Sequence, residues 1–145
     1  MQIPSSESIL DAFVHGQECA QVTLAPLARR LGLTCRQAQR LTACFGGGMG
    51  CQGPCGAVSA ALMALGLAYG HDGPDQLARK EALLARRQAL LAEVQSAFGS
   101  VRCDGILTGH PHAGPGYNPI CAQVVRHVLA QLDAELPSDT TGQPV

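Results

Sequence analysis

The sequence predicts an all-α domain, a compact bundle of about five to six helices with a buried central helix preceded by a glycine-rich loop. Apolar residues make up 46% of the 145 residues and charged residues 14%, so the chain can build a hydrophobic core. Aromatic residues make up only 3%, and alanine takes their place, which favours closely packed helices over sheets. We expect one domain over residues 1–136 and a flexible C-terminal tail over residues 137–145.

The N-terminal third predicts two helices in succession. A short amphipathic helix follows the N-cap Ser5 and ends at Gly16. A second helix is expected over residues 17–33, and Pro26 must kink or restart it because proline lacks the backbone N–H that an interior helical position uses.

The third helix is expected from Cys35 to about Cys44, after the N-cap Thr34. Its apolar side carries Ala38, Leu41 and Phe45, which follow helical spacing.

The middle of the chain contains thirty residues without a charge, from Leu41 to Gly70. Residues 45–53 are too rich in glycine for regular structure. Pro54 is expected at the first position of a helix that runs from Cys55 to about Tyr69. A membrane span needs about 20 apolar residues, which this helix does not reach, so we expect a buried central helix instead.

The C-terminal half predicts an outer helix, a short turn and a final helix. The outer helix extends from about Asp75 to Phe98, and its charged residues are expected to form a solvated face. Residues 100–109 hold a short helical turn, and residues 110–116 form a loop. Asn118 caps a last helix that reaches about Leu136.

Charge and the N-terminal sequence exclude several function classes. The chain has 10 basic and 11 acidic residues and no basic stripe, which argues against nucleic-acid binding. The N-terminus lacks the basic and apolar regions of a signal peptide, so a cytoplasmic location is expected. The glycine-rich run lacks the Lys and Ser or Thr of a phosphate-binding loop, so a small-ligand or anion-binding module is the least favoured function.

Seven cysteines are the most unusual feature of the composition. An odd number in a reducing compartment favours metal or redox chemistry over a disulfide framework, and neither a C-x-x-C pair nor the C-x-x-C-H motif of covalent haem is present. Four cysteines are expected at or near helix starts, where free N–H groups and the helix dipole stabilise a thiolate. These four are Cys19, Cys55, Cys103 and Cys121.

The other three cysteines have different expected roles. Cys35 and Cys44 are expected to be small buried hydrophobic residues. Cys51, within the glycine-rich loop, is the best candidate for an auxiliary thiol.

The run Phe45-Gly46-Gly47-Gly48-Met49-Gly50, followed by Cys55-Gly56-Ala57-Val58-Ser59, resembles the C_GCAxxG_C_C family of redox-active proteins. The resemblance covers roughly residues 17–132 and assigns the upstream cysteine to Cys19, the motif cysteine to Cys55 and the downstream pair to Cys103 and Cys121. The last glycine of the motif is Ala60 in this chain. The resemblance implies a redox role, and a related helical module in split-Soret-type cytochromes is associated with an iron–sulfur centre.

Two mechanisms follow from these residues. In the first, Cys19, Cys55, Cys103 and Cys121 hold an iron–sulfur or other metal centre for electron transfer, or zinc as a redox-silent version. The glycine-rich loop, through Gly46, Gly47, Gly48, Gly50 and Cys51, would then contact the cofactor and offer N–H groups to its sulfurs. In the second, a metal-free protein uses Cys55 as the attacking thiol and a second cysteine to resolve the disulfide. A protein redox partner is expected, and the outer helix 75–98 could dock it or form a homodimer.

The histidines have no assigned role. His15, His110 and His112 are expected to be exposed imidazoles, although a metal-ligating or basic role for them stays open. His71 is expected after a helix end and His127 on the surface.

Overall fold

A computed structural model describes residues 1–110 and 118–138 of the chain, and within these ranges every regular element is helical. The all-α prediction is confirmed, with slightly more helices than expected. The α-helices are α1 (Ser6–Val14), α2 (Cys19–Leu24), α3 (Cys35–Thr42), α4 (Gly56–Tyr69), α5 (Leu77–Phe98), α6 (Cys103–Leu107) and α7 (Pro119–Glu135). The shorter turns are η1 (Ala25–Leu27), η2 (Arg29–Leu31) and η3 (Gly48–Gln52).

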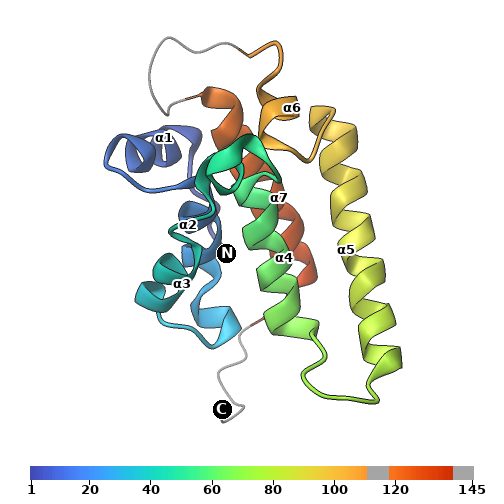
Figure 1. Cartoon of the computed structure of the whole chain (residues 1–145). Helices are drawn as coiled ribbons and strands as arrows, with labels where there is room; N and C mark the ends of the chain where they lie inside the picture. Colours follow the sequence, from blue (N-terminus) through green and yellow to red (C-terminus); the bar gives the residue numbers. More distant parts are fainter. Residues whose placement is uncertain (111–117, 139–145) are drawn as a thin grey trace.

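Helix α4 is the buried central helix that the sequence predicts. It packs against α2, α5 and α7 (Figure 1). Its buried positions are mostly small residues, among them Ala57, Ala60, Ala61 and Ala64. Small side chains let neighbouring helix backbones approach closely, since the distance between helix axes depends on the residues at the contact. Alanine, rather than aromatic side chains, therefore fills the contacts between α4 and its neighbouring helices.

The segment predicted as one kinked helix over residues 17–33 is three shorter pieces. Helix α2 starts at Cys19, because Glu18 and Gln21 form a capping box at its N-terminus. After Leu24 the chain tightens into η1 and η2, with Pro26 in the first turn of η1. The break at Pro26 is confirmed, and the remainder of the predicted helix is too tightly wound to be α-helical.

Helix α3 begins at Cys35 as predicted, with a capping box formed by Thr34 and Gln37. Its orientation differs from the prediction. Ala38 and Thr42 are buried, whereas the Leu41 side chain is 57% exposed. Thr42 tolerates burial because its hydroxyl donates to the carbonyl oxygen of Ala38 at 2.8 Å.

The start of the central helix also differs from the prediction. Pro54 is not its first residue, because Cys55 takes the N-cap position, with φ −57° and ψ 133°. Pro54 instead pairs with Arg102 in a short antiparallel bridge. The Cys55 N–H donates to the carbonyl oxygen of Val101 at 2.9 Å, and the Cys103 N–H donates to that of Gly53 at 2.7 Å. These bonds tie the starts of α4 and α6 together.

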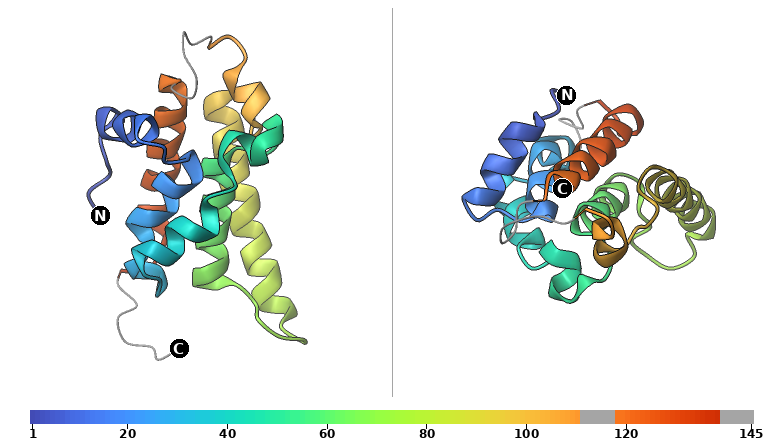
Figure 2. Two further views of the ribbon diagram at one scale, coloured as in Figure 1. Left: turned by 60° about the vertical axis from the view of Figure 1, so that its left-hand side comes forward. Right: turned by 90° about the horizontal axis from the view of Figure 1, so that it is seen from above.

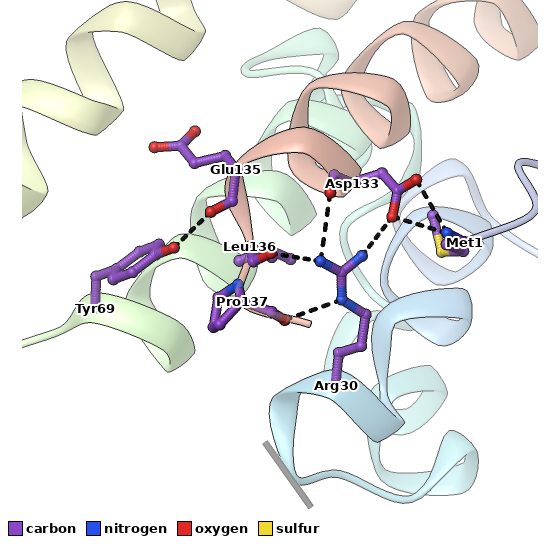
Figure 3. Close-up of polar contacts among 7 residues, drawn as sticks. All are labelled: Met1, Arg30, Tyr69, Asp133, Glu135, Leu136 and Pro137. Carbon is purple, nitrogen blue, oxygen red and sulfur yellow. Dashed lines mark hydrogen bonds and ion pairs between the residues drawn. The ribbon is translucent and has the colours of Figure 1, made fainter. Parts of the chain in front are cut away.

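A polar cluster holds the opposite end of the bundle (Figure 3). The Arg30 guanidinium in η2 contacts the carboxylate of Asp133 at 2.5 Å and donates to the carbonyl oxygen of Leu136 at 2.6 Å. The amino group of Met1 also contacts Asp133, at 3.1 Å. The N-terminal segment is thereby fastened to the end of α7.

Arg86 of α5 departs from the solvated face expected for the charges of that helix. Its guanidinium lies 4.0 Å from the centre of the Tyr69 ring and 2.6 Å from the carboxylate of Glu135. The Tyr69 hydroxyl donates to the carbonyl oxygen of Glu135 at 2.6 Å. Helices α4, α5 and α7 are joined by these contacts. Helix α5 itself begins at Leu77, two residues after the predicted start.

Crossing a bilayer requires a longer and more apolar helix than any that the described part of the chain contains.

Candidate functional site

The four cysteines predicted at helix starts line one cavity of about 220 Å³. Cys19 and Cys103 are the first residues of α2 and α6, Cys55 is the N-cap of α4, and Cys121 is the third residue of α7. We call these four the cavity cysteines. Helices α2, α4 and α7 all begin at the same end of the molecule, beside α6 (Figure 1). Their positive N-terminal ends therefore converge on the cavity.

The remaining walls of the cavity are mostly apolar. Phe13, Ile106, Leu107 and Val124 line it together with the polar residues Gln17, Glu18 and Asn118. Asn118 is already occupied, because its Oδ1 accepts from the Ile120 N–H at 3.0 Å and its Nδ2 donates to the carbonyl oxygen of His110. None of the described lining residues is a lysine, arginine or histidine. A thiolate formed in this cavity would lack a cationic side chain beside it.

Burial raises the thiol pKa of all four cavity cysteines above its usual value. The pKa of Cys19 rises to about 11, first through burial and then through the charge of Cys55. The pKa of Cys121 rises to about 12, first through burial and then through the charges of the other three. This corrects the expectation that helix starts lower these values, because desolvation outweighs the helix N-terminal contribution.

Backbone N–H groups do act on two of these sulfurs in the expected direction. The N–H groups of Gly47 and Ala20 lower the pKa of Cys19, although burial keeps that pKa high. The N–H groups of Val58 and Ala57, in the first turn of α4, likewise lower the pKa of Cys55. The Cys55 side chain forms no N-cap hydrogen bond with α4. These N–H groups oppose the effect of burial on both thiols but do not overcome it.

The predicted cofactor-contacting glycines have separate roles. Gly47 lines the cavity. A Cβ on Gly46 would overlap the Glu18 side chain, and one on Gly48 would come within 2.8 Å of the Cys103 Cβ. Gly48 and Gly50 have positive φ values of 61° and 70°, and Gly50 has open space around it. The turn therefore needs glycine at Gly46 and Gly48 because neighbouring atoms approach closely. It needs glycine at Gly48 and Gly50 because the backbone φ is positive there.

Gly56 is a site residue that the residue-by-residue reasoning missed. A Cβ added to it would lie 2.4 Å from the carbonyl oxygen of Phe45 and 2.5 Å from the sulfur of Cys19. The signal was present in the sequence, since Gly56 directly follows the motif cysteine. Glu18, which precedes Cys19 and lines the cavity, was also missed.

The other three cysteines, which we call the surface cysteines, all lie outside the cavity lining: Cys35, Cys44 and Cys51. Cys35 and Cys44 are exposed, so the expectation that they are buried is wrong, because α3 turns Ala38 and Thr42 inward instead. Cys51 is exposed, and its thiol donates to the carbonyl oxygen of Gly48 at 3.4 Å. Its role as an auxiliary thiol stays a prediction.

The described histidines lie away from the cavity lining. His15 is exposed and contacts Asp11, and His71 and His110 are also exposed. His127 is half-buried rather than on the surface, with its ring 5.3 Å from that of Phe98. His112 lies outside the described residues.

Among residues 1–110 and 118–138, no three Cys, His, Asp or Glu side chains are grouped so as to hold a single metal ion. The cavity cysteines are thus brought to one cavity without forming a ready-made site for one ion.

Comparison with known proteins gives one match. The sequence model of a family described as "Putative redox-active protein (C_GCAxxG_C_C)" matches residues 17–134. No curated protein and no solved structure matches the chain. The matched segment includes all four cavity cysteines and the glycine-rich turn. The chain therefore belongs to the C_GCAxxG_C_C family of redox-active proteins.

Proposed function

We propose that this protein binds an iron–sulfur cluster through the four cavity cysteines and acts in electron transfer. The observation that carries the proposal is the meeting of four half-buried thiols in one mostly apolar cavity, without a cationic side chain among the described lining residues. Such thiols stay protonated at neutral pH on their own, because burial disfavours the charged form. The four cavity cysteines would hold the cluster as thiolates, whose negative charge the bound metal would offset.

The size of the cavity favours a cluster over a single zinc ion. Zinc draws four sulfurs to about 2.3 Å from the metal, which leaves no space between them. Here the four cavity cysteines line a cavity of about 220 Å³. A multinuclear centre needs four thiolates that are farther apart.

The chain's own groups would tune and protect such a centre. A bound cluster would supply one-electron chemistry at a potential that hydrogen bonds and burial adjust. The Gly47 N–H is directed toward the Cys19 sulfur, and the N–H groups of Ala57 and Val58 toward the Cys55 sulfur. Apolar side chains such as Phe13 limit water in the cavity. We also propose a cytoplasmic location, where reducing conditions would keep the surface cysteines as thiols.

The metal-free thiol–disulfide mechanism has weaker support. An attacking cysteine needs a substantial thiolate fraction near neutral pH. The pKa of Cys55, its proposed nucleophile, is raised by burial. This mechanism would therefore operate slowly at neutral pH.

Anaerobic reconstitution with iron and sulfide tests the proposal. We expect a brown protein with stoichiometric iron and sulfide, which Cys121→Ser loses. Cys44→Ser is the matched control, since it removes an exposed thiol outside the cavity lining, and we expect it to keep the iron. A colourless protein, or one that binds a single zinc ion in place of iron, refutes the cluster. Loss of two thiols per chain under mild oxidant, reversed by dithiothreitol, would support the disulfide mechanism instead.

A further inference from the structure

The cavity meets solvent beside a single acidic side chain. Of the described residues that line the cavity, only Glu18 and Gly47 are exposed, and the others are half-buried or buried. We call these two residues the mouth of the cavity. Glu18 is also the only charged residue in the described lining. The mouth therefore carries one negative charge and no positive charge.

The Glu18 carboxylate lies against the glycine-rich run. A Cβ added to Gly46 would overlap the Glu18 Oε2, so the carboxylate has room here because residue 46 is a glycine. The Glu18 N–H donates to the Gln21 Oε1 at 2.9 Å, and the Gln21 Nε2 donates to the carbonyl oxygen of Gln39 at 3.1 Å. These bonds fix the backbone of Glu18. Its carboxylate forms no ion pair with any residue that the structure describes, so no cation neutralises it there.

The charge of Glu18 acts on the cavity cysteine that follows it in the chain. Burial is the largest cause of the raised pKa of Cys19, and the charge of Glu18 raises that pKa further. The Gly47 N–H is directed toward the same sulfur. The turn η3 that follows Gly47 lies beside α6, η3 in green and α6 in orange (Figure 2). A small molecule that reaches the Cys19 sulfur past Gly47 therefore passes the Glu18 carboxylate.

We propose that Glu18 is a specificity-determining residue that selects by charge among the small molecules that reach the cavity cysteines. It holds back anionic disulfides and other anionic oxidants, and it admits neutral molecules and metal cations. Charges at the entrance of a cleft change the rate at which charged ligands enter, and repulsion rejects unwanted ones. The inference rests on the proposed function, because the selection protects a bound centre and admits the metal that the centre needs.

Two other roles of Glu18 predict different behaviour. A side chain that only blocks the mouth slows all entering molecules of one size equally, whatever their charge. A side chain that acts only through the pKa of Cys19 changes the thiolate fraction, which affects every reagent at this sulfur equally. The ratio of the rates of two similar reagents that differ in charge cancels both effects.

Alkylation of the full chain, reduced and free of metal, measures this ratio. Iodoacetate is an anion and iodoacetamide is neutral, and a thiolate displaces iodide from either reagent. Peptide mass spectrometry follows the modification of Cys19 at mildly alkaline pH. Two unit charges about 6 Å apart in a water-like dielectric change a rate about threefold. We therefore expect E18Q to raise the iodoacetate-to-iodoacetamide ratio about threefold at about 0.02 M salt, and to have no effect on it at about 1 M salt.

A matched variant tests whether the position of the charge decides the result. Glutamine has nearly the size of glutamate, so E18Q changes mainly the charge. E81Q removes the same charge from the exposed Glu81 of α5, and we expect it to leave the ratio unchanged. An unchanged ratio in E18Q overturns the proposal, even if both reagents react faster, because Glu18 then acts by blocking the mouth or through the pKa of Cys19. An equal rise of the ratio in E81Q also overturns it, because net charge alone then explains the effect.

The outcomes separate this inference from the proposed function, because the alkylation experiment contains no iron. Iron binding is measured separately on reconstituted samples. A protein that shows the expected ratios and binds no iron refutes the cluster and supports the charge selection. A protein that binds iron, and whose ratio E18Q does not change, refutes the charge selection and leaves the cluster standing.

Discussion

Replacement of Gly56 by alanine tests whether the close contact between α4 and the cavity controls the site. An added Cβ would lie 2.4 Å from the Phe45 carbonyl oxygen and 2.5 Å from the Cys19 sulfur, which is well inside van der Waals contact. Overpacking of this kind costs about 1–3 kcal/mol. The helix propensity of alanine returns at most about 1 kcal/mol, and less at the first position of a helix. We expect G56A to destabilise the protein by about 1–2 kcal/mol.

Gly66 provides the control within the same helix. A Cβ at Gly66 meets no heavy atom within 4 Å, so G66A should stabilise the protein by up to about 1 kcal/mol through helix propensity. Urea unfolding of the reduced proteins measures both changes, and the difference between the variants should be about 1–3 kcal/mol. G56A should also lower Tm by about 3–8 °C and bind less iron on reconstitution. Equal stability of G56A and G66A would refute the reasoning, because the contact with Cys19 would then have no cost.

Four further predictions concern the thiols and the polar contacts. At pH 7 the surface cysteines of the reduced, metal-free protein should react with Ellman's reagent at least about tenfold faster than the cavity cysteines. Above about pH 9 the same protein should lose stability. The folded-state pKa values of Cys19 and Cys121 are raised to about 11 and about 12, so these thiols ionise first in the unfolded chain. A urea midpoint that stays constant from about pH 9 to about pH 11 would contradict this. The Met1 amino group and Arg30 lower the pKa of Asp133. The ionised Asp133 therefore stabilises the folded state fully above the usual pKa of about 3.9, and this stabilisation is lost as the pH falls through the lower folded-state pKa. D133N should reduce the dependence of the urea midpoint on acid pH. Removal of the Tyr69 hydroxyl in Y69F should cost about 1 kcal/mol, because the 2.6 Å bond to the Glu135 carbonyl is lost, and an unchanged midpoint would show that water replaces it.

Local signals in the sequence were sufficient where a short segment decides its own structure. The capping residues Thr34 and Asn118 begin α3 and α7 where predicted, because their side chains bond to N–H groups within three residues. The uncharged, alanine-rich segment after the glycine-rich run forms the buried central helix. Such interactions need no knowledge of the rest of the chain.

Predictions failed where a distant residue intervenes. Pro54 is outside α4 because it pairs with Arg102, which is remote in sequence. Leu41 is exposed because α3 packs through Ala38 and Thr42, and the sequence spacing permitted either side. The thiol pKa values are raised because partial burial in the cavity desolvates the four sulfurs, an effect that the helix-start argument did not contain.

The sequence by itself determined the fold class, the family and the positions of four cysteines at helix starts, because composition, motif order and capping residues are local properties. Only the tertiary structure decided that these four cysteines line one cavity and that the other three lie outside its lining. It also decided the sign of their pKa shifts and the exposure of Glu18 beside Cys19. Burial and proximity depend on how α2, α4, α6 and α7 pack against one another, and short-range patterns do not carry that information.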